Sequence, residues 1–388
     1  MNADFDIAVL GAGVIGAASA RHLAEAGARV VVIDAAGPAA GASGASDGAV
    51  SGASKKPGTL ARLATASLLY TRALAAGGML AGAFVPRPAW YFATLDAEEQ
   101  ALGALIAKLR AIDGPVRTRA DGTAALLPGT GPAVRRLVEI DGEGHMTGYA
   151  ATAAFLDHPG IERRWPDAVL AIEPDGSGVT VALASGRLRA RAAVVALGLG
   201  TLSLFPGLPV RPRAGQLFIT DRGQGGQLPG ALTAASYLIA KTEDPIRLPE
   251  PPVVIDPLAT GQYLIGSSRE EHGDPARVDF ATMLALVRRA ASVWPALAER
   301  RVIRAFAGVR AATVDGLPIV GPLPGAANVI VATGFEGDGI CLAALIGREV
   351  AAMALERALD PALEADLTAL SPARFDTLTE DRRTSWAR

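Results

Sequence analysis

The first forty residues combine two short apolar runs with one segment of helical spacing. Phe5 to Leu10 form an apolar run of strand length, and Arg29 to Ile33 form a second run rich in β-branched side chains. Between them, apolar positions in residues 14–26 recur every three or four residues, as in an amphipathic helix, and Gly27 suits the end of that helix. The pattern predicts a strand, a helix and a second strand, the βαβ unit of a parallel sheet.

Three glycines lie in the turn between the first strand and the helix. Gly11, Gly13 and Gly16 have the spacing G-x-G-x-x-G. In a dinucleotide-binding unit, the first glycine permits the tight bend, the second lets a pyrophosphate approach the backbone, and the third lets the helix pack on the sheet. The backbone amides of Val14 and Ile15, at the start of the helix, are then expected to face the phosphates.

The second strand is followed by Asp34 and Ala35. A carboxylate at this distance from the glycine turn accepts hydrogen bonds from the adenosine ribose. Strand, turn, helix and acid together predict a dinucleotide site that includes Asp34 and Ala35. They do not choose between NAD and FAD.

A long stretch dominated by Gly, Ala and Ser follows Asp34, before the next helix-like segment. On composition alone it is typical of a flexible linker. Flavoproteins, however, need a thin loop here, and residues 41–46 resemble the second nucleotide motif of the D-amino-acid oxidase family of FAD enzymes. That family includes glycine oxidase, sarcosine oxidase and D-amino-acid dehydrogenases. The resemblance implies that this loop contacts FAD through Gly41, Ala42, Ser43, Ser46, Asp47 and Gly48.

Later segments resemble the same family in the expected order, so the resemblance covers nearly the whole chain. They are a strand with its glycine turn at 190–201, a crossover at 209–220, and a strand, glycine turn and helix at 307–355. The glycines of the last turn permit the backbone to run under a flat ring, and the positive end of the following helix favours a reduced flavin. The implied FAD contacts are Val169, beside the adenine, and Ala196, Gly198, Gly308, Arg310, Gly334, Gly337, Asp338, Gly339 and Ile340.

The resemblance also implies the chemistry, which is hydride transfer from an amine-bearing carbon to flavin N5. Such a reaction needs positioning more than a strong base. Arg310 aligns with the arginine that binds the substrate carboxylate in glycine-oxidase-like relatives, and its planar guanidinium suits that role. Tyr237, Lys241 and Tyr263 lie in the region expected to form the sheet over the flavin, although simple packing or surface exposure explains each of them equally well.

The chain departs from the family pattern at several positions. Phe335 stands where many relatives have His, and Ala311 stands where they have Pro. Asp34 replaces the more usual Glu and keeps the carboxylate. The single cysteine, Cys341, lies beyond the glycine turn, so FAD is expected to bind non-covalently.

The composition of the chain argues against several other classes of protein. The chain has 388 residues, 50% of them hydrophobic and 20% charged, which excludes a disordered protein and favours two lobes. A net charge of −2 argues against nucleic acid as a partner, and one Cys with four His argues against a metal site. The two charge-free stretches, 192–210 and 316–335, contain prolines and are not expected to span a membrane. With Asp4 and Asp6 before the first apolar run, a cytoplasmic location is expected.

The resulting expectation is an α/β fold, with a discontinuous Rossmann-like FAD-binding domain (1–85, 141–212 and 308–388). An α+β substrate domain with a mixed or antiparallel sheet is expected from 86–140 and 213–307. The segments at 88–96 and 261–271 are expected as its strands, and 280–297 as its amphipathic helix.

The chain looks most like the β subunits of hetero-oligomeric dehydrogenases that act on opines, proline or D-hydroxyproline. It is expected to oxidise the C–N bond of an amino or imino acid or an opine-like amine, as the FAD subunit of a dehydrogenase. Any FMN or iron–sulfur cluster is expected only in partner subunits. The alternatives are a stand-alone oxidase that forms hydrogen peroxide and a flavin-binding structural subunit with little activity.

Overall fold

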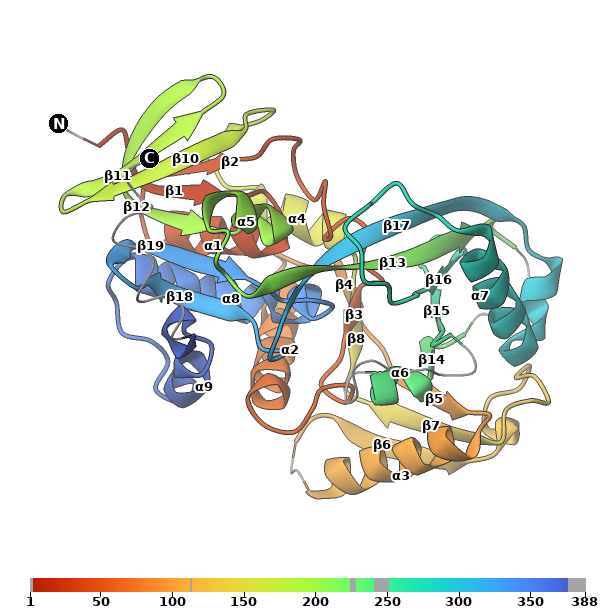
Figure 1. Cartoon of the computed structure of the whole chain (residues 1–388). Helices are drawn as coiled ribbons and strands as arrows, with labels where there is room; N and C mark the ends of the chain where they lie inside the picture. Colours follow the sequence, from red (N-terminus) through yellow and green to blue (C-terminus); the bar gives the residue numbers. More distant parts are fainter. Residues whose placement is uncertain (1–2, 112–113, 224–227, 241–250, 376–388) are drawn as a thin grey trace.

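The strands of the chain form three sheets, and the two large ones dominate the two lobes in Figure 1. The structure is a computed structural model that describes residues 3–111, 114–223, 228–240 and 251–375. The first sheet has the order β10 (Val169–Asp175), β11 (Gly178–Leu183), β12 (Gly186–Val195), β1 (Phe5–Leu10), β2 (Val30–Ile33) and β9 (Ile161–Arg164). In addition, β19 (Ala326–Thr333) pairs with β12, and β18 (Ile319–Leu323) pairs with β19.

The second sheet has the order β17 (Val302–Thr313), β13 (Val210–Thr220), β16 (Tyr263–Gly266), β15 (Val254–Pro257), β14 (Ala231–Ala234), β5 (Ala89–Ala93), β7 (Arg136–Asp141) and β6 (Arg117–Gly122). A small third sheet, with β3 (Ala49–Val50), β8 (Gly144–Met146) and β4 (Phe84–Pro86), lies between the lobes. The helices are α1 (Val14–Glu25), α2 (Thr59–Ala76), α3 (Asp96–Ala111), α4 (Gly148–Leu156), α5 (Thr201–Leu204), α6 (Ser236–Ala240), α7 (Phe280–Val293), α8 (Gly339–Ala354) and α9 (Glu364–Thr368).

The centre of the first sheet is buried on both faces, which explains why β1 and β2 are almost continuously apolar. Strands β1, β2, β9, β12 and β19 run parallel where they pair. Along β1, Ile7 and Val9 face one hydrophobic cluster, whereas Ala8 and Leu10 face another. A parallel sheet covered on both sides needs apolar residues at successive positions rather than an apolar–polar alternation.

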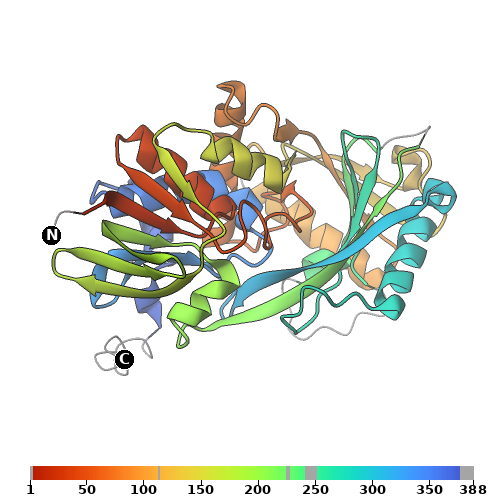
Figure 2. The same ribbon diagram turned by 90° about the horizontal axis from the view of Figure 1, so that it is seen from above.

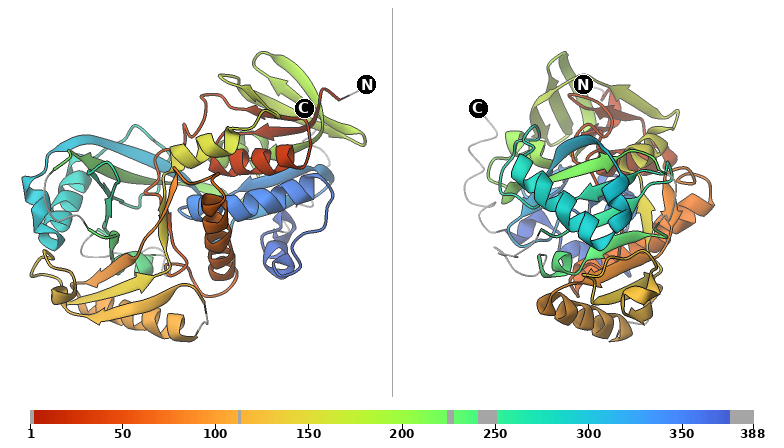
Figure 3. Two further views of the ribbon diagram at one scale, coloured as in Figure 1. Left: turned by 180° about the vertical axis from the view of Figure 1, so that it is seen from behind. Right: turned by 90° about the vertical axis from the view of Figure 1, so that its right-hand side faces the viewer.

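Helices α1 and α8 pack closely against each other beside this sheet, as the left view of Figure 3 shows. Gly347 of α8 makes this approach possible, because a Cβ atom there would lie 2.5 Å from the Cβ of Ala18 in α1. Helix α1 ends before Gly27, whose φ of 88° belongs to the left-handed region that glycine adopts without strain.

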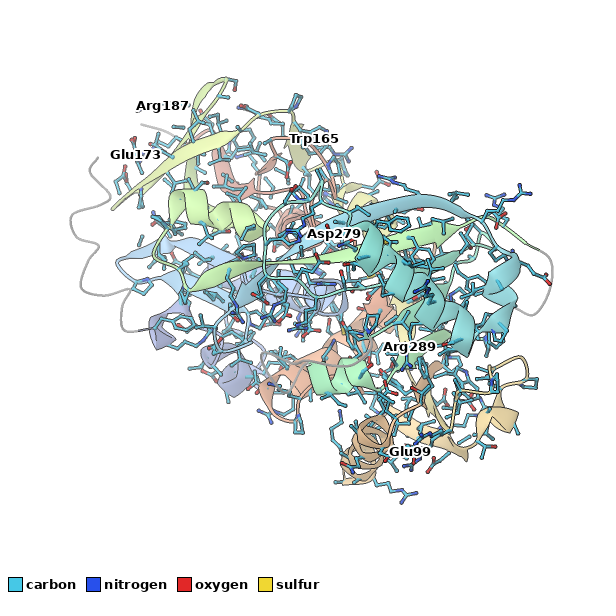
Figure 4. The ribbon with its side chains drawn as sticks, turned by 45° about the vertical axis from the view of Figure 1, so that its right-hand side comes forward. Glu99, Trp165, Glu173, Arg187, Asp279 and Arg289 are labelled. Atoms are coloured by element: carbon cyan, nitrogen blue, oxygen red, sulfur yellow. The ribbon has the colours of Figure 1, made fainter. Side chains whose placement is uncertain are left out.

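In the second lobe, the large sheet packs between α7 and α3. Along β5, Trp90 and Phe92 face a cluster that includes Leu286 of α7, whereas Tyr91 faces the cluster that includes Leu102 of α3. A buried ion pair joins the two helices, since Arg289 of α7 lies 3.0 Å from Glu98 of α3. Figure 4 labels Arg289, Asp279 at the start of α7, and Glu99 next to Glu98. The same view labels Glu173 and Arg187 at the outer end of the first lobe, far from these helices.

Two long antiparallel strands connect the lobes. Figure 2 shows β13 and β17 running side by side from the first lobe to the outer end of the second. Their pairing extends from Val210 with Thr313 to Thr220 with Val302. Residues on these strands near the first lobe are therefore held between the two large sheets.

The predicted fold class is confirmed, with a Rossmann-like βαβ unit in one lobe and a mixed sheet in the other. The domain boundaries stay a prediction. All strands of the first sheet fall inside the expected FAD-domain segments, whereas β13 and β17 cross the expected boundaries. Among the helices of the described residues, none is long and apolar enough to cross a membrane.

We expect Gly347→Ala to destabilise the fold, because the added Cβ would also lie 2.9 Å from the backbone nitrogen of Ser19. Overpacking of this kind typically costs about 1–3 kcal/mol. Thermal unfolding followed by circular dichroism should therefore show a lower midpoint. The matched control is Gly103→Ala in α3, where the nearest atom would lie 3.9 Å from the new Cβ. That control should gain up to about 1 kcal/mol from helix propensity. An unchanged or higher midpoint for Gly347→Ala would contradict the close packing of α1 and α8.

Candidate active site

The turn after β1 brings backbone close to backbone. Gly11 has a φ of 108°, and a Cβ there would lie 2.4 Å from the carbonyl oxygen of Ala196. A Cβ on Gly16 would lie 2.0 Å from the carbonyl oxygen of Gly11. Both positions therefore require glycine, and α1 begins directly beyond the turn with Gly13 as its N-cap, which has no side chain to bind the first amides. This leaves the helix N-terminus suited to an anion.

Asp34 uses its carboxylate to organise the same turn. Its Oδ2 accepts a hydrogen bond from the backbone nitrogen of Ala12 at 2.8 Å, and its Oδ1 accepts from those of Ala36 and Gly37 at 2.8 Å each. These bonds fix the carboxylate at the end of β2, where it lines a cavity. Its remaining lone pairs suit the hydroxyls of a ribose.

The Gly/Ala/Ser-rich loop is ordered against the start of α1. The backbone nitrogen of Val14 donates to Ser43 Oγ at 3.0 Å, and Ser46 Oγ donates to the carbonyl of Ser43 at 2.9 Å. Because Ser43 Oγ accepts the Val14 amide, its own hydrogen is available to a ligand in the cavity. The loop acts as a wall of the site rather than as a linker.

These elements enclose a cavity of about 490 Å³. The predicted residues that line it are Gly11, Gly13, Val14, Ile15, Asp34, Gly41, Ala42, Ser43, Ser46, Asp47, Ala196, Gly198, Gly308, Arg310, Gly334, Gly337, Gly339, Ile340 and Tyr237. Gly16, Ala35, Gly48, Val169 and Asp338 do not line it. Gly16 and Gly48 instead allow close packing, since a Cβ on Gly48 would lie 2.5 Å from the ring of His145.

The second glycine turn closes the far end of this cavity. Gly334 has a φ of 75°, and a Cβ there would lie 2.4 Å from Thr313. Helix α8 begins at Gly339, so its first amides also face the cavity. Asp338, which precedes the helix, forms a buried ion pair with Lys55 at 2.5 Å. Burial opposes the charge of the Lys55 ammonium, but Asp338 outweighs it and holds the pKa of Lys55 above its ordinary value.

A smaller cavity of about 350 Å³ adjoins the first. Tyr237, Ser267, Arg310, Glu336 and Gly337 line both, so the two spaces meet at these residues. The larger cavity, with its two helix N-termini and its carboxylate, is arranged like a dinucleotide site, and the smaller one lies where a substrate would reach it.

Arg310 lies at this junction with its guanidinium positioned by neutral groups. Its Nη2 donates to Ser267 Oγ at 2.6 Å, and its Nη1 donates to the carbonyl of Ala214 at 3.2 Å. Gly215 on the paired strand makes room, because a Cβ there would lie 2.5 Å from Arg310 Nη2. Within the described residues, no carboxylate forms an ion pair with Arg310.

Three further charged residues at the site were missed by sequence reasoning. Glu336 accepts from Arg269 at 2.5 Å and from Arg213 at 3.0 Å, through the same oxygen. Lys55 lies in the low-complexity loop, and Arg269 lies two residues after Ser267. No local pattern marks these residues, since they lie in separate segments, after β3, β16 and β19, that only the tertiary fold brings together.

The two predicted aromatic residues differ in their surroundings. Tyr263 lies on β16 in the hydrophobic cluster that includes Trp294 and Leu286 of α7, and it lines neither cavity. Tyr237 lines both cavities, but from α6 rather than from a strand. Lys241 lies outside the described residues. Cys341 is fully buried on α8, and burial raises the pKa of its thiol.

Fold and site together are those of a two-lobed dinucleotide-binding enzyme, in which a smaller cavity adjoins the larger one. The chain belongs to the FAD dependent oxidoreductase (DAO) family, which matches residues 6–353. The predicted family is thus confirmed, and the chain is an oxidoreductase of the glycine-oxidase-like kind that acts on amino acids or amines.

Individual relatives agree with this assignment. The chain is 26% identical over 363 residues to glycine oxidase of Bacillus licheniformis, which covers 92% of this chain and 94% of that protein. The crystal structure of glycine oxidase from Geobacillus kaustophilus superposes with a TM-score of 0.84 at 26% identity, and covers 96% of this chain and 99% of that one.

Two other relatives match over part of their length. The tRNA 5-methylaminomethyl-2-thiouridine biosynthesis bifunctional protein MnmC of Thiobacillus denitrificans is 30% identical over 95% of this chain, which spans 59% of that protein. One of the opine oxidase subunits of Rhizobium meliloti is 27% identical over 51% of this chain and 49% of that protein.

The residues present fit FAD. The glycine turn admits a pyrophosphate, Asp34 suits a ribose, and the backbone of Gly337 to Gly339 can lie along a flat ring. Bound FAD would supply the hydride acceptor for an oxidation in the smaller cavity.

We expect Asp34→Asn to weaken FAD binding about 10- to 100-fold, roughly 1.4–2.7 kcal/mol, because an amide NH₂ group would face backbone donors. Titration of the apoprotein with FAD, followed by flavin fluorescence, measures this. Asp6→Asn is the control: Asp6 also accepts a backbone hydrogen bond, from Arg29 at 2.9 Å, but it lies outside the cavity at the other end of β1. Equal FAD affinity in the two variants would refute the assignment of Asp34.

Proposed function

We propose that the chain oxidises the C–N bond of an amino acid, an imino acid or an opine-like secondary amine whose carboxylate binds Arg310. The observation that carries this proposal is the position of Arg310, at the junction of the two cavities with no ion-pair partner among the described residues. A guanidinium held by neutral acceptors keeps its charge available, and its planar donors match a carboxylate.

The chain contributes orientation to this reaction. The substrate carbon loses a hydride and its nitrogen loses a proton, and water then hydrolyses the resulting C=N bond. Arg310 would hold the carboxylate while Ser267 and the Ala214 carbonyl hold Arg310. With the reacting carbon fixed beside the larger cavity, proximity accounts for much of the expected rate.

The N-terminus of α8 supports an electrostatic role as well. The amides of Gly339 and Ile340 face the larger cavity, and a helix N-terminus stabilises negative charge nearby. This would favour the reduced, more negative form of a bound flavin. We further propose that FAD is held non-covalently, because Cys341 is fully buried and lines neither cavity.

We also propose that the chain passes its electrons to a partner subunit, as the FAD subunit of a dehydrogenase. The similarity to the opine oxidase subunit of Rhizobium meliloti supports this. The full-length similarity to glycine oxidase favours the second candidate, a stand-alone oxidase that reduces oxygen to hydrogen peroxide. The cytoplasmic location expected from the sequence stays a prediction.

We expect Arg310→Met to lower kcat/KM about 100-fold, near 2.7 kcal/mol, since it removes a charge-assisted bond to the substrate. The measurement is anaerobic flavin bleaching with D-amino acids, proline derivatives and opines, at matched FAD content. Arg304→Met is the control, because Arg304 is exposed on the same strand and lines neither cavity. If none of these compounds bleached the flavin of the unaltered protein, the chain would instead be a flavin-binding structural subunit.

The electron acceptor can be tested separately. For a dehydrogenase subunit, the purified chain should turn over with dye acceptors and consume oxygen at least about 100 times more slowly. An oxygen electrode together with a peroxide assay measures both rates on the same substrate. Fast oxygen consumption with stoichiometric peroxide would establish the oxidase instead.

A further inference from the structure

The charges around the smaller cavity do not balance one to one. Three carboxylates line it, and each already has a cationic partner: Asp338 pairs with Lys55, Asp315 with Arg374, and Glu336 with both Arg213 and Arg269. Lys55, Lys56, Arg269 and Arg310 also line the cavity, so the lining holds one more cation than carboxylates. Because Arg213 and Arg374 pair with Glu336 and Asp315 from outside the lining, these carboxylates do not depend on Arg269 or Arg310 for a cationic partner.

Glu336 forms ion pairs with two arginines, Arg213 and Arg269, so Arg269 can bind a ligand in its place. The side chain of Arg213 is only 4% exposed and stays bound to Glu336 at 3.0 Å. Arg213 also binds Glu271 at 2.8 Å, so it is shared between two carboxylates. Arg269 can leave Glu336, whose side chain is 21% exposed, while Arg213 still neutralises part of the charge of Glu336. Of the two arginines, only Arg269 lines the smaller cavity.

The backbone of Glu336 indicates that this arrangement is imposed. Its φ is 48°, a left-handed conformation that non-glycine residues adopt only at an energetic cost. A glycine at this position would avoid that cost. The conformation directs the Glu336 carboxylate toward Arg213 and Arg269, at the junction of the two cavities.

Arg269 and Arg310 are near enough to share one small ligand. Ser267, which accepts from Arg310 at 2.6 Å, precedes Arg269 by two residues, so the Cα atoms of Ser267 and Arg269 are about 7 Å apart at most. The positive charge of Arg310 also contributes to lowering the pKa of Arg269, after burial as the main cause and against the opposing effect of Glu336. Both arginines line the same small cavity.

We propose that Arg269 is a second carboxylate subsite, and that the preferred substrate is a secondary amine with a carboxylate on each side of its nitrogen. This inference rests on the proposed function, in which Arg310 binds the first carboxylate. Glu336 forms the ion pair with Arg269 when the second carboxylate is absent. When that carboxylate binds, Arg269 exchanges Glu336 for it.

Two sulfur compounds test the subsite without turnover, because neither has a C–N bond. Thiodiacetate carries two carboxylates and (methylthio)acetate carries one. Each is titrated into the FAD-loaded protein, and binding is followed by the change in the flavin absorbance spectrum. Thiodiacetate should bind at least about tenfold more tightly in the unaltered protein, as expected for one added charge-assisted contact.

The variants locate the subsite. Arg269→Met should bring the ratio of the two dissociation constants close to one, and Arg269→Lys should keep part of the preference. Glu336→Gln, which removes the competing carboxylate, should increase the ratio and serves as the second test if Arg269→Met does not fold. A ratio near one in the unaltered protein, or one that Arg269→Met leaves intact, would overturn the proposal.

The same titrations test this inference separately from the proposed function on which it rests. Arg310→Met should weaken both compounds if Arg310 binds the common carboxylate. If (methylthio)acetate binds through Arg310 but thiodiacetate shows no advantage, the second subsite is wrong and the proposed function stands. If neither compound depends on Arg310, both fail.

Discussion

The site depends on the pairing of β13 with β17. These strands pair from Val210–Thr313 to Thr220–Val302, so a single ladder extends from the nucleotide-binding lobe into the second lobe. Register along the ladder decides which side chains reach the cavities, because neighbouring positions of a strand point to opposite faces. Arg310 stands opposite Arg213 in this register. A slip of one residue would turn Arg310 away from the junction.

Close backbone approaches complement this ladder. Gly11 against Ala196, Gly16 against Gly11, and Gly334 against Thr313 leave no space for a side chain. In each case the missing Cβ lets a turn approach another element at the rim of the larger cavity. A cofactor that contacts the backbone needs turns without side chains on the cavity side. This need explains why these glycines lie at turns.

Sequence patterns predicted the parts of the molecule whose causes are local. The strand, helix and strand from Phe5 to Ile33 follow from apolar spacing, and α8 follows from the glycine turn before it. Arg310 was found through a family resemblance and lies at the junction, although its role stays a proposal. The burial of Tyr263 could not be predicted, because the pattern of β16 does not say which face is covered by α7. Its burial depends on packing between elements distant in sequence.

The charged residues of the site also could not be predicted from sequence patterns. Lys55 with Asp338 and Arg269 with Glu336 are brought together from separate segments, and no spacing in the sequence connects them. Buried ion pairs contribute little net stability, because desolvation offsets their attraction. Four of these charges lining one small cavity therefore point to recognition rather than to support of the fold. The neutral partners of Arg310 strengthen that conclusion. A cation whose charge is already neutralised has a carboxylate beside it, as Lys55 does, whereas Arg310 is held by a hydroxyl and a carbonyl that leave its charge for an incoming anion.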